Sequence, residues 1–307
     1  MTKRTLPRIL LLSSAEIEET TVINDDFVRV LNESLAGKCQ LEWRNYQEIG
    51  IRLGTGALEA YVVETGEPLS AYRAVYFKSY FRYHEQATAI AEALEAQNIH
   101  FVGTELRQYI PAYKLSQLAR LARSGLHIPK TLYLPMPHYL KQYNEVVEQL
   151  GTEFIFKAID GSTGDDNYLI RNEAQLKKVV AAHADRHFIA QSFVPNESDL
   201  RVLVVGGVIR LVIERRRKDN STHLNNTSQG AQAKLIALAD VSPEIKETAL
   251  RAANIMNREI AGVDIMEHAD TKVPYVLEVN ASPQIASGAF MEEKLEVFRD
   301  YFEGLAV

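Results

Sequence analysis

The stretch Tyr275–Ser282, YVLEVNAS, places a carboxylate and an amide, Glu278 and Asn280, inside an otherwise apolar run. Because successive side chains of a strand point to opposite faces, Glu278 and Asn280 are expected on one face together with Val276, and Val279 on the other. An unpaired buried carboxylate costs several kcal/mol, so the polar face requires a cation, a hydrogen-bonding partner or water. The stretch alone leaves open an edge strand whose polar face is simply wet.

A second carboxylate precedes this strand, in the sequence GVDIM at residues 262–266. Asp264 alternates there with Val263 and Ile265, which predicts a strand with Asp264 on its polar face. If the two strands pair as a hairpin, the oxygens of Asp264, Glu278 and Asn280 converge. Oxygen ligands without His or Cys are typical of a hard cation, Mg²⁺ or Mn²⁺, whose other positions go to water and phosphate. By spacing alone, a solvated hairpin face is equally favoured.

Composition sets the broad class of protein. The chain has 307 residues, enough for two or three domains or subdomains, and a formal net charge of −6, which argues against a general nucleic-acid-binding surface. Cys39 is the only cysteine, so an internal disulfide and a CxxC metal site are excluded. Cys39 has apolar neighbours and is expected to be buried. A reducing, cytoplasmic location fits this cysteine usage.

No apolar run predicts a targeting or membrane segment. The run Ile9–Leu12 is shorter than the roughly 7 to 15 residues of a signal-peptide core, and we interpret it as a first strand. The run at 202–213 is interrupted by Gly206, Gly207 and Arg210, well short of the roughly 20 residues of a membrane-spanning helix. It is better explained as a hairpin that turns at the paired glycines.

Hydrophobic periodicity divides the chain into two types of region. Over the first hundred or so residues, short apolar strands alternate with amphipathic helices, which predicts a parallel α/β sheet, and residues 50–70 are expected to be less regular. Beyond them, hairpins mixed with helices predict an α+β body. We expect three units, at residues 1–110, 111–190 and 191–307.

Two further groups of residues carry charge. Lys157 lies in the apolar strand FIFKAID, ahead of the small-residue loop GSTG, whose backbone N–H groups can bind phosphate oxygens. A short loop of this composition is more often an ordinary hairpin turn, and no Walker sequence is present. Of the basic residues in the hairpin at 198–218, most are expected on a solvated face, with two or three at most in an anion pocket.

The order of these features resembles the ATP-grasp fold, and most closely the RimK-type ligases. The features are Lys114 on a helix, Lys157 before GSTG, the strand AQSFVPNESDLR, the hairpin ending IERRR, the segment LNNTSQGA, GVDIM and LEVNASP. The resemblance covers about residues 110–290, and the preceding α/β region looks like a pre-ATP-grasp domain. It implies ATP held between two α+β subdomains, with two Mg²⁺ ions.

The resemblance also implies roles for individual residues. Asp264, Glu278 and Asn280 would bind the metal ions, while Arg201 would contact the transferring phosphoryl or acyl group. ATP would be contacted by Lys114, Lys157, Ser162 in the lid loop, the hinge residues Gln191, Ser192, Phe193 and Val194, Asp199 near the ribose, and Asn226 near the γ-phosphate.

The implied activity is carboxylate–amine ligation through an acylphosphate, on a small acid, a peptide or a protein tail. A kinase acting on a hydroxyl, or a nucleotide-binding protein without catalysis, is the alternative. Members of the family often form homo-oligomers. Where the resemblance leads us to expect an arginine, the chain has Gln229, and Ser192, Ala231 and Gln284 also depart from the usual pattern. We therefore do not predict glutamate as the amino acid that this chain adds.

Overall fold

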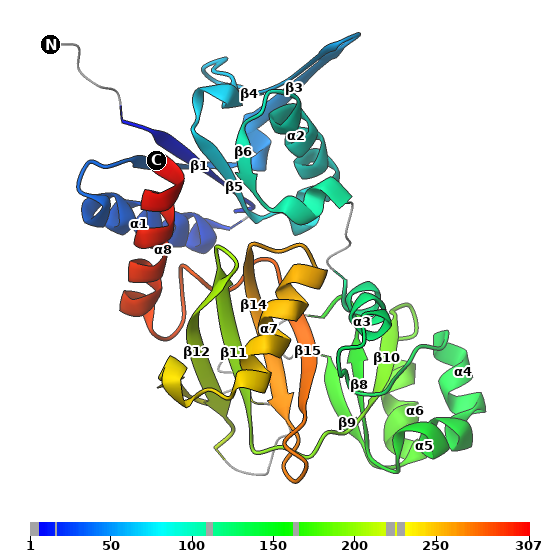
Figure 1. The fold of residues 1–307 in the computed structure, drawn as a ribbon. Helices are drawn as coiled ribbons and strands as arrows, with labels where there is room; N and C mark the ends of the chain where they lie inside the picture. The colour runs from blue at the N-terminus through cyan, green and yellow to red at the C-terminus, as the bar shows by residue number, and fades with distance from the viewer. Residues whose placement is uncertain (1–5, 16, 109–112, 162–165, 219–224, 226–230) are drawn as a thin grey trace, which may run out of the picture.

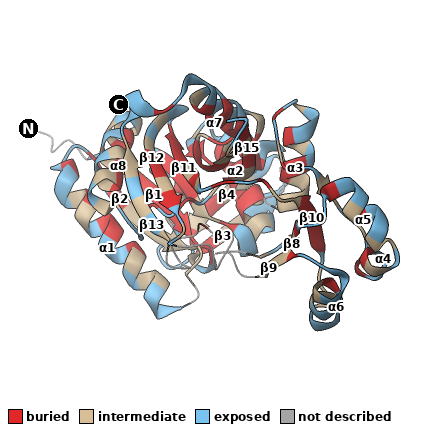
Figure 2. Cartoon of the chain, turned by 90° about the horizontal axis from the view of Figure 1, so that it is seen from below, coloured by how far each residue is buried: buried red, intermediate tan, exposed pale blue. Residues whose placement is uncertain are grey.

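The computed structural model describes residues 6–15, 17–108, 113–161, 166–218, 225 and 231–307 (Figure 1). Within these residues the chain forms three main sheets in sequence order and one separate two-stranded ribbon. Figure 2 shows that buried residues concentrate along the strands, whereas the outer turns of the helices are exposed. Short 3-10 helices connect several elements, at Tyr46–Glu48, Leu69–Ala71, Phe81–Tyr83, Thr104–Gln108 and Leu238–Asp240.

The first sheet is parallel throughout, with strand order β2-β1-β5-β6. Its strands are short and apolar, and amphipathic helices connect them, so the predicted parallel α/β arrangement is confirmed. Cys39 lies in its core, 3% exposed, as expected, and burial raises the pKa of its thiol. The elements are β1 (Arg8–Ser13), α1 (Glu18–Leu35), β2 (Gln40–Asn45), β5 (Ala74–Ser79), α2 (His84–Ala96) and β6 (His100–Val102).

Residues 50–70, expected to be less regular, contain a hairpin. Strand β3 (Ile49–Gly54) pairs with β4 (Ala57–Val62), and Gly56 supplies the positive φ of +71° at the turn. Ile51 and Leu58 pack against the apolar core between the first sheet and α2. Ile49, Ala60 and Val62 are buried at the base of the ribbon, whereas residues 52–57 at its tip are exposed, so the apolar alternation typical of a strand is interrupted there.

The second sheet has the order β7-β10-β8-β9 and is antiparallel. Phe154, Phe156 and Phe188 form its core together with residues of the covering helices. Residues 138–151, expected as one helix, contribute to two helices that are separated at Gln142. The elements are β7 (Thr131–Leu132), α4 (Met136–Lys141), α5 (Tyr143–Leu150), β8 (Phe154–Ala158), β9 (Asn167–Ile170), α6 (Glu173–Ala182) and β10 (Phe188–Ser192). Helix α3 (Lys114–Arg123) precedes them in sequence but packs on the third sheet, where Leu121 belongs to the core.

The third sheet is antiparallel, with strand order β13-β12-β11-β14-β15. The predicted hairpin turn is present at Gly206 and Gly207, whose φ angles are +65° and +73°. Ser242 caps α7 by accepting a hydrogen bond from the backbone N–H of Ile245. The elements are β11 (Ser198–Val205), β12 (Val208–Arg216), β13 (Gln232–Ile236), α7 (Pro243–Ile255), β14 (Ile260–Glu267) and β15 (Pro274–Asn280).

Alternation along these strands gives the third sheet two different faces. Val202, Val263 and Val279 belong to the core under α7, which crosses the sheet in Figure 1. Their neighbours Arg201 and Asp264 therefore point to the opposite face. That second face carries the candidate site.

The C-terminal helix α8 (Met291–Ala306) connects the first sheet to the third. Phe298 and Phe302 lie in one core with residues of β1 and α1 and with Leu203 of β11 (Figure 1). The last helix of the predicted 191–307 unit thus packs on the first unit as well as on its own sheet.

Across the described residues, no helix combines the length and apolarity needed to cross a bilayer.

Candidate active site

Strand pairing places three charged residues in one row across the third sheet. Arg201 of β11 lies opposite Asp264 of β14, and Asp264 lies opposite Glu278 of β15. Asn280 lies opposite Gly262, two positions further along the same pair of strands, and its amide nitrogen is 3.3 Å from the Gly262 carbonyl oxygen. The predicted hairpin between GVDIM and YVLEVN is confirmed, and its register brings the two carboxylates side by side.

One detail of the predicted strand is wrong. The register shifts between Asp264 and Ile265, so that Ile265 lies opposite Val276 while Asp264 lies opposite Glu278. The extra residue, Leu277, forms a bulge that turns Val276 to the apolar face, where it is fully buried with Val279. Simple alternation had placed Val276 on the same face as Glu278.

Asp264 is held by two arginines from the neighbouring strands. Its carboxylate accepts hydrogen bonds from Nε and Nη2 of Arg201, the second at 2.8 Å, and Oδ2 lies 3.2 Å from Nη2 of Arg215. Asp264 is only 7% exposed, and burial by itself would raise its pKa. The two guanidinium charges outweigh burial and hold the pKa of Asp264 below its usual value.

Arg215 also pairs with Asp199, directly opposite it on β11. The Nε of Arg215 donates to Oδ1 of Asp199 at 2.6 Å, and both side chains are buried. Burial raises the pKa of Asp199 to about 6 against the attraction of Arg215. Asp199, which the resemblance placed near the ribose, is thus engaged in a buried ion pair in this structure.

The donor set fits a hard cation. A carboxylate offers about four lone-pair positions, and the contacts to Arg201 and Arg215 occupy three of those on Asp264. Glu278 is half-buried and has no hydrogen bond or ion pair to another described residue. Glu278, the remaining position on Asp264 and the Asn280 amide oxygen could hold Mg²⁺. Within the described ranges, no group of three or more His, Cys, Asp or Glu side chains could hold a metal ion. The set named here has two carboxylates and one amide.

Lys157, on β8 of the second sheet, and Lys114, the first residue of α3, lie near this row. Burial lowers the pKa of Lys157 to about 8; the negative charges of Glu278 and Asp264 oppose that shift, and the positive charge of Lys114 adds to it. Lys114 Nζ donates to the carbonyl oxygen of Gly161, at the start of the GSTG loop. Ser162 in that loop and Asn226 lie outside the described residues. Lys157 of the second sheet therefore interacts electrostatically with the carboxylates of Glu278 and Asp264 on the third sheet.

The predicted hinge residues lie where β10 leads into β11. Gln191 is buried and its side-chain amide donates to Oγ1 of Thr131 at 2.8 Å. The N–H of Ser192 donates to the carbonyl of Lys130, and the carbonyl of Val194 accepts from the side chain of Asn196. Phe193 lies between them, outside regular secondary structure. The segment connects the second sheet to the third.

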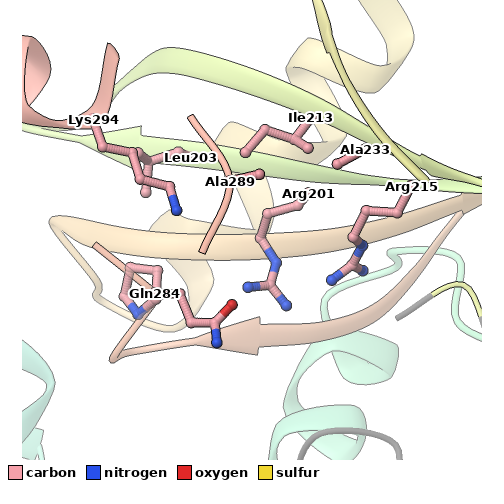
Figure 3. A pocket seen from close by; sticks show the side chains of 9 residues that line it. Arg201, Leu203, Ile213, Arg215, Ala233, Gln284, Ala289 and Lys294 are labelled. Atoms are coloured by element: carbon pink, nitrogen blue, oxygen red, sulfur yellow. The ribbon is translucent and has the colours of Figure 1, made fainter. Parts of the chain in front are cut away.

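Two charged residues of this region were not singled out from the sequence. Arg215 had appeared only as one member of a basic run. A regular hairpin with its turn at Gly206 and Gly207 would place Glu214 opposite Asp199, and the register shift between Leu203 and Val204 brings Arg215 there instead. Lys294 lies on α8, whose sequence is that of an ordinary amphipathic helix. Tertiary packing leaves Lys294 only 6% exposed. Both line a pocket on the charged face of the third sheet, shown in Figure 3.

The fold is shared with solved ATP-grasp structures. The ATP-grasp ligase PsnB, in complex with precursor peptide PsnA2 and AMPPNP, superposes with a TM-score of 0.70 at 17% identity over the whole of both chains. D-alanyl-alanine synthetase A from Vibrio cholerae gives a TM-score of 0.69 at 15% identity, over 99% of this chain and 98% of that one. The architecture is therefore an ATP-grasp fold with an amino-terminal α/β domain.

The family follows from sequence comparison. A profile of the RimK-like ATP-grasp domain matches residues 112–297, and the chain belongs to this family. A probable alpha-L-glutamate ligase of Syntrophotalea carbinolica is 29% identical over 201 residues, 64% of each chain. A ribosomal protein bS6–L-glutamate ligase of Shigella boydii is 30% identical over 174 residues, 55% of each chain. The matched region spans between about half and two thirds of these relatives.

Proposed function

We propose that this protein is an ATP- and Mg²⁺-dependent carboxylate–amine ligase. The observation that carries the proposal is the meeting of Lys157 from one lobe with Glu278 and Asp264 from the other. Such an arrangement suits a triphosphate held between cationic side chains and divalent ions. Relatives named as glutamate ligases and the ATP-grasp ligases of known structure support this reaction class.

The proposed reaction has two steps. An oxygen of the substrate carboxylate bonds to the γ-phosphorus of ATP while the bond from that phosphorus to the β–γ bridging oxygen breaks, and ADP leaves with the electron pair. The amine nitrogen then attacks the acyl carbon, phosphate leaves, and the amine proton passes to phosphate or water. Mg²⁺ at Asp264, Glu278 and Asn280, with two ions proposed, would neutralise the triphosphate and polarise the γ-phosphoryl group.

The chain's own residues provide binding and positioning. Lys157 of β8 and Lys114 of α3 would neutralise phosphate charge, and Arg201, in the row with the carboxylates, would contact the transferring phosphoryl or acyl group. Ser162, the hinge Gln191–Val194, Asp199 and Asn226 are proposed ATP contacts.

The ligase is proposed to act on a small acid, a peptide or a protein tail, with an amine as the acceptor. A relative named for ribosomal protein bS6 and a fold neighbour bound to a precursor peptide support a peptide or protein substrate. A homo-oligomeric assembly stays a prediction.

The test is ADP release on a matrix of acids and amines, with hydroxylamine present to trap an acylphosphate as the hydroxamate. Lys157→Met and Glu278→Gln are each expected to lower the rate by about 100-fold or more, because each removes charge stabilisation from phosphoryl transfer. The exposed residues of α6 supply matched controls, Lys177→Met and Glu173→Gln, which should retain the wild-type rate. Undiminished turnover in Glu278→Gln contradicts the metal assignment, and a phosphorylated hydroxyl formed without any amine indicates a kinase.

A further inference from the structure

A pocket extends along the charged face of the third sheet, next to Arg201 (Figure 3). Leu203 and Ile213 form an apolar wall on β11 and β12, and the chain between β15 and α8 contributes Pro283 and Gln284 on the other side. In Figure 3 the side chains of Arg201, Arg215 and Lys294 extend to the same side of the strands as Gln284. A molecule in this pocket would adjoin the row of Arg201, Asp264 and Glu278.

The charge of the pocket is not balanced. The two arginines are paired with Asp264 and Asp199, whereas Lys294 has no ion-pair partner in the part of the chain that the structure describes. Its Nζ donates to the neutral carbonyl oxygen of Ser287 at 2.8 Å. The residues that line the pocket include no aspartate or glutamate. Lys294 therefore brings a buried positive charge that no carboxylate of the described residues pairs with.

The position of Lys294 is unfavourable in three respects. Burial and the nearby charge of Arg201 lower the pKa of Lys294 to about 8, burial being the larger cause. The residue lies at the fourth position of α8, where the helix dipole disfavours a cation. Because an isolated buried charge is costly, its retention beside a pocket indicates a site for an anion.

The loop before α8 is shaped around this ammonium group. Gly288 has a φ of +81°, and a Cβ there would lie 3.4 Å from Oε1 of Gln284 and 3.7 Å from Nζ of Lys294. The backbone thus passes close to both side chains, which glycine permits. Gln284 adds a neutral amide that can donate a hydrogen bond to an anionic oxygen.

We propose that Lys294 binds a substrate carboxylate that is not the one activated, so that the pocket selects a substrate carrying a free carboxylate beside its reacting group. The inference rests on the proposed ligase function and names a substrate class for it. The carboxylate belongs either to the acid substrate, which is then a dicarboxylate, or to the amine, which is then an amino acid. The recognition chemistry is the same in both cases.

Binding of matched probes tests this selection without turnover. Calorimetry on the full chain with Mg²⁺ and AMPPNP would compare glutarate with glutaramate, its monoamide, and L-alanine with L-alaninamide. One charged probe is expected to bind the wild type about tenfold tighter than its amide, because Lys294 forms a charge-assisted contact. Lys294→Met should reduce that preference to about twofold or less, Lys294→Arg should keep most of it, and Lys177→Met should bind as the wild type does.

A second variant tests the proposal even if Lys294→Met does not fold. Gln284→Glu keeps the side-chain size and adds a negative charge facing the ammonium, so it should weaken the charged probe about tenfold and leave its amide unaffected. AMPPNP affinity should remain that of the wild type in each variant. The pair that shows the preference identifies whether the acid or the amine carries the carboxylate.

Three outcomes overturn the inference: equal binding within both pairs, no binding of either charged probe, or a preference that survives both Lys294→Met and Gln284→Glu. Failure of the ligase proposal looks different. In that case the charged probe is still preferred, but no acid in the matrix yields ADP or hydroxamate.

Discussion

The two faces of the third sheet are built from alternate residues of the same strands, yet they obey different physical rules. On the face under α7, Val202, Val263 and Val279 are fully buried among apolar neighbours. On the opposite face, Arg201 and Asp264 are largely withdrawn from water in direct ion pairs. The first face needs only volume and apolarity, whereas the second requires each charge to find a partner.

The comparison shows where function can be placed without loss of the fold. An apolar face is stabilised by the area it removes from water, about 25 cal/mol per Å², and tolerates similar shapes. A buried ion pair contributes little net stability but is costly to break. The charged face is therefore maintained by its pairings and by ligands, and the apolar face maintains the sheet.

Breaking the central pairing is expected to give the largest effect. Asp264→Ala leaves the half-buried Arg201 without its partner and removes one of the two carboxylates that contact the buried Arg215. The free energy of unfolding should therefore fall by about 3–5 kcal/mol, and ADP release should fall by about 10²–10³-fold. Urea titration and the ADP assay measure the two effects. An Asp264→Ala protein with wild-type stability would mean that the guanidinium groups are solvated rather than buried.

A change on the opposite face of the same strand should separate stability from chemistry. Val263→Ala removes two buried methyl groups and leaves a cavity, for an expected loss of about 2–3 kcal/mol of unfolding free energy. Its ATP affinity, measured by calorimetry below the unfolding temperature, should match that of the wild type. Weaker ATP binding in Val263→Ala would show that the two faces are coupled.

The buried ammonium of Lys294 predicts a pH dependence of stability. Its pKa is about 8 in the folded protein, against 10.5 for an unperturbed lysine, so above pH 8 the unfolded chain binds more protons than the folded one. Stability should therefore rise with pH above about 8, and Lys294→Met should remove about 1–2 kcal/mol of that rise between pH 8 and 9.5.

Chemical unfolding across this pH range provides the measurement. Burial also lowers the pKa values of Lys78 and Lys157 to about 8. Both lysines remain in Lys294→Met, so this variant keeps part of the wild-type rise of stability with pH. Identical slopes for wild type and Lys294→Met would place the Lys294 ammonium in water.

The smallest effect is expected from a single methyl group beside Arg201. A Cβ at Gly262 would lie 3.2 Å from Cδ of Arg201 and 3.0 Å from Cβ of Pro283, so Gly262→Ala should shift the guanidinium and lower kcat/KM about tenfold. Gly304→Ala in α8 is the control, since a Cβ there meets nothing within 4 Å and should stabilise the helix by up to about 1 kcal/mol. Equal activity in the two variants would show that Arg201 adapts freely.

Much of the fold follows from local sequence. The parallel first sheet, the glycine turn at 206–207 and the hairpin of β14 with β15 were all predicted, because short-range periodicity and turn residues encode them. The β3–β4 ribbon was missed because the exposed residues 52–57 at its tip interrupt the apolar alternation. The site residues Lys157, Arg201, Asp264 and Glu278 came from motif order, and the structure brings them together.

Other features depended on contacts distant in sequence. The bulge at Leu277, which separates Val276 from Glu278, arises from pairing with β14 and has no signal within YVLEVN. The pairing of Arg215 with Asp199 requires the hairpin register to be known. A run of basic residues looks the same in sequence whether one member is buried or all are solvated.

The sequence by itself determined the family, the parallel first sheet and two hairpins of the third sheet, and it supplied candidate residues for a nucleotide and its cations, because periodicity and motif order are local properties. Only the tertiary structure decided which charges are neutralised and which are not. Lys294 is an ordinary helical lysine in the sequence, and it becomes a buried cation with no ion-pair partner among the described residues because α8 packs across β11 and β12 beside Arg201. Burial and pairing are properties of the packed chain, since they depend on neighbours that lie far apart in sequence.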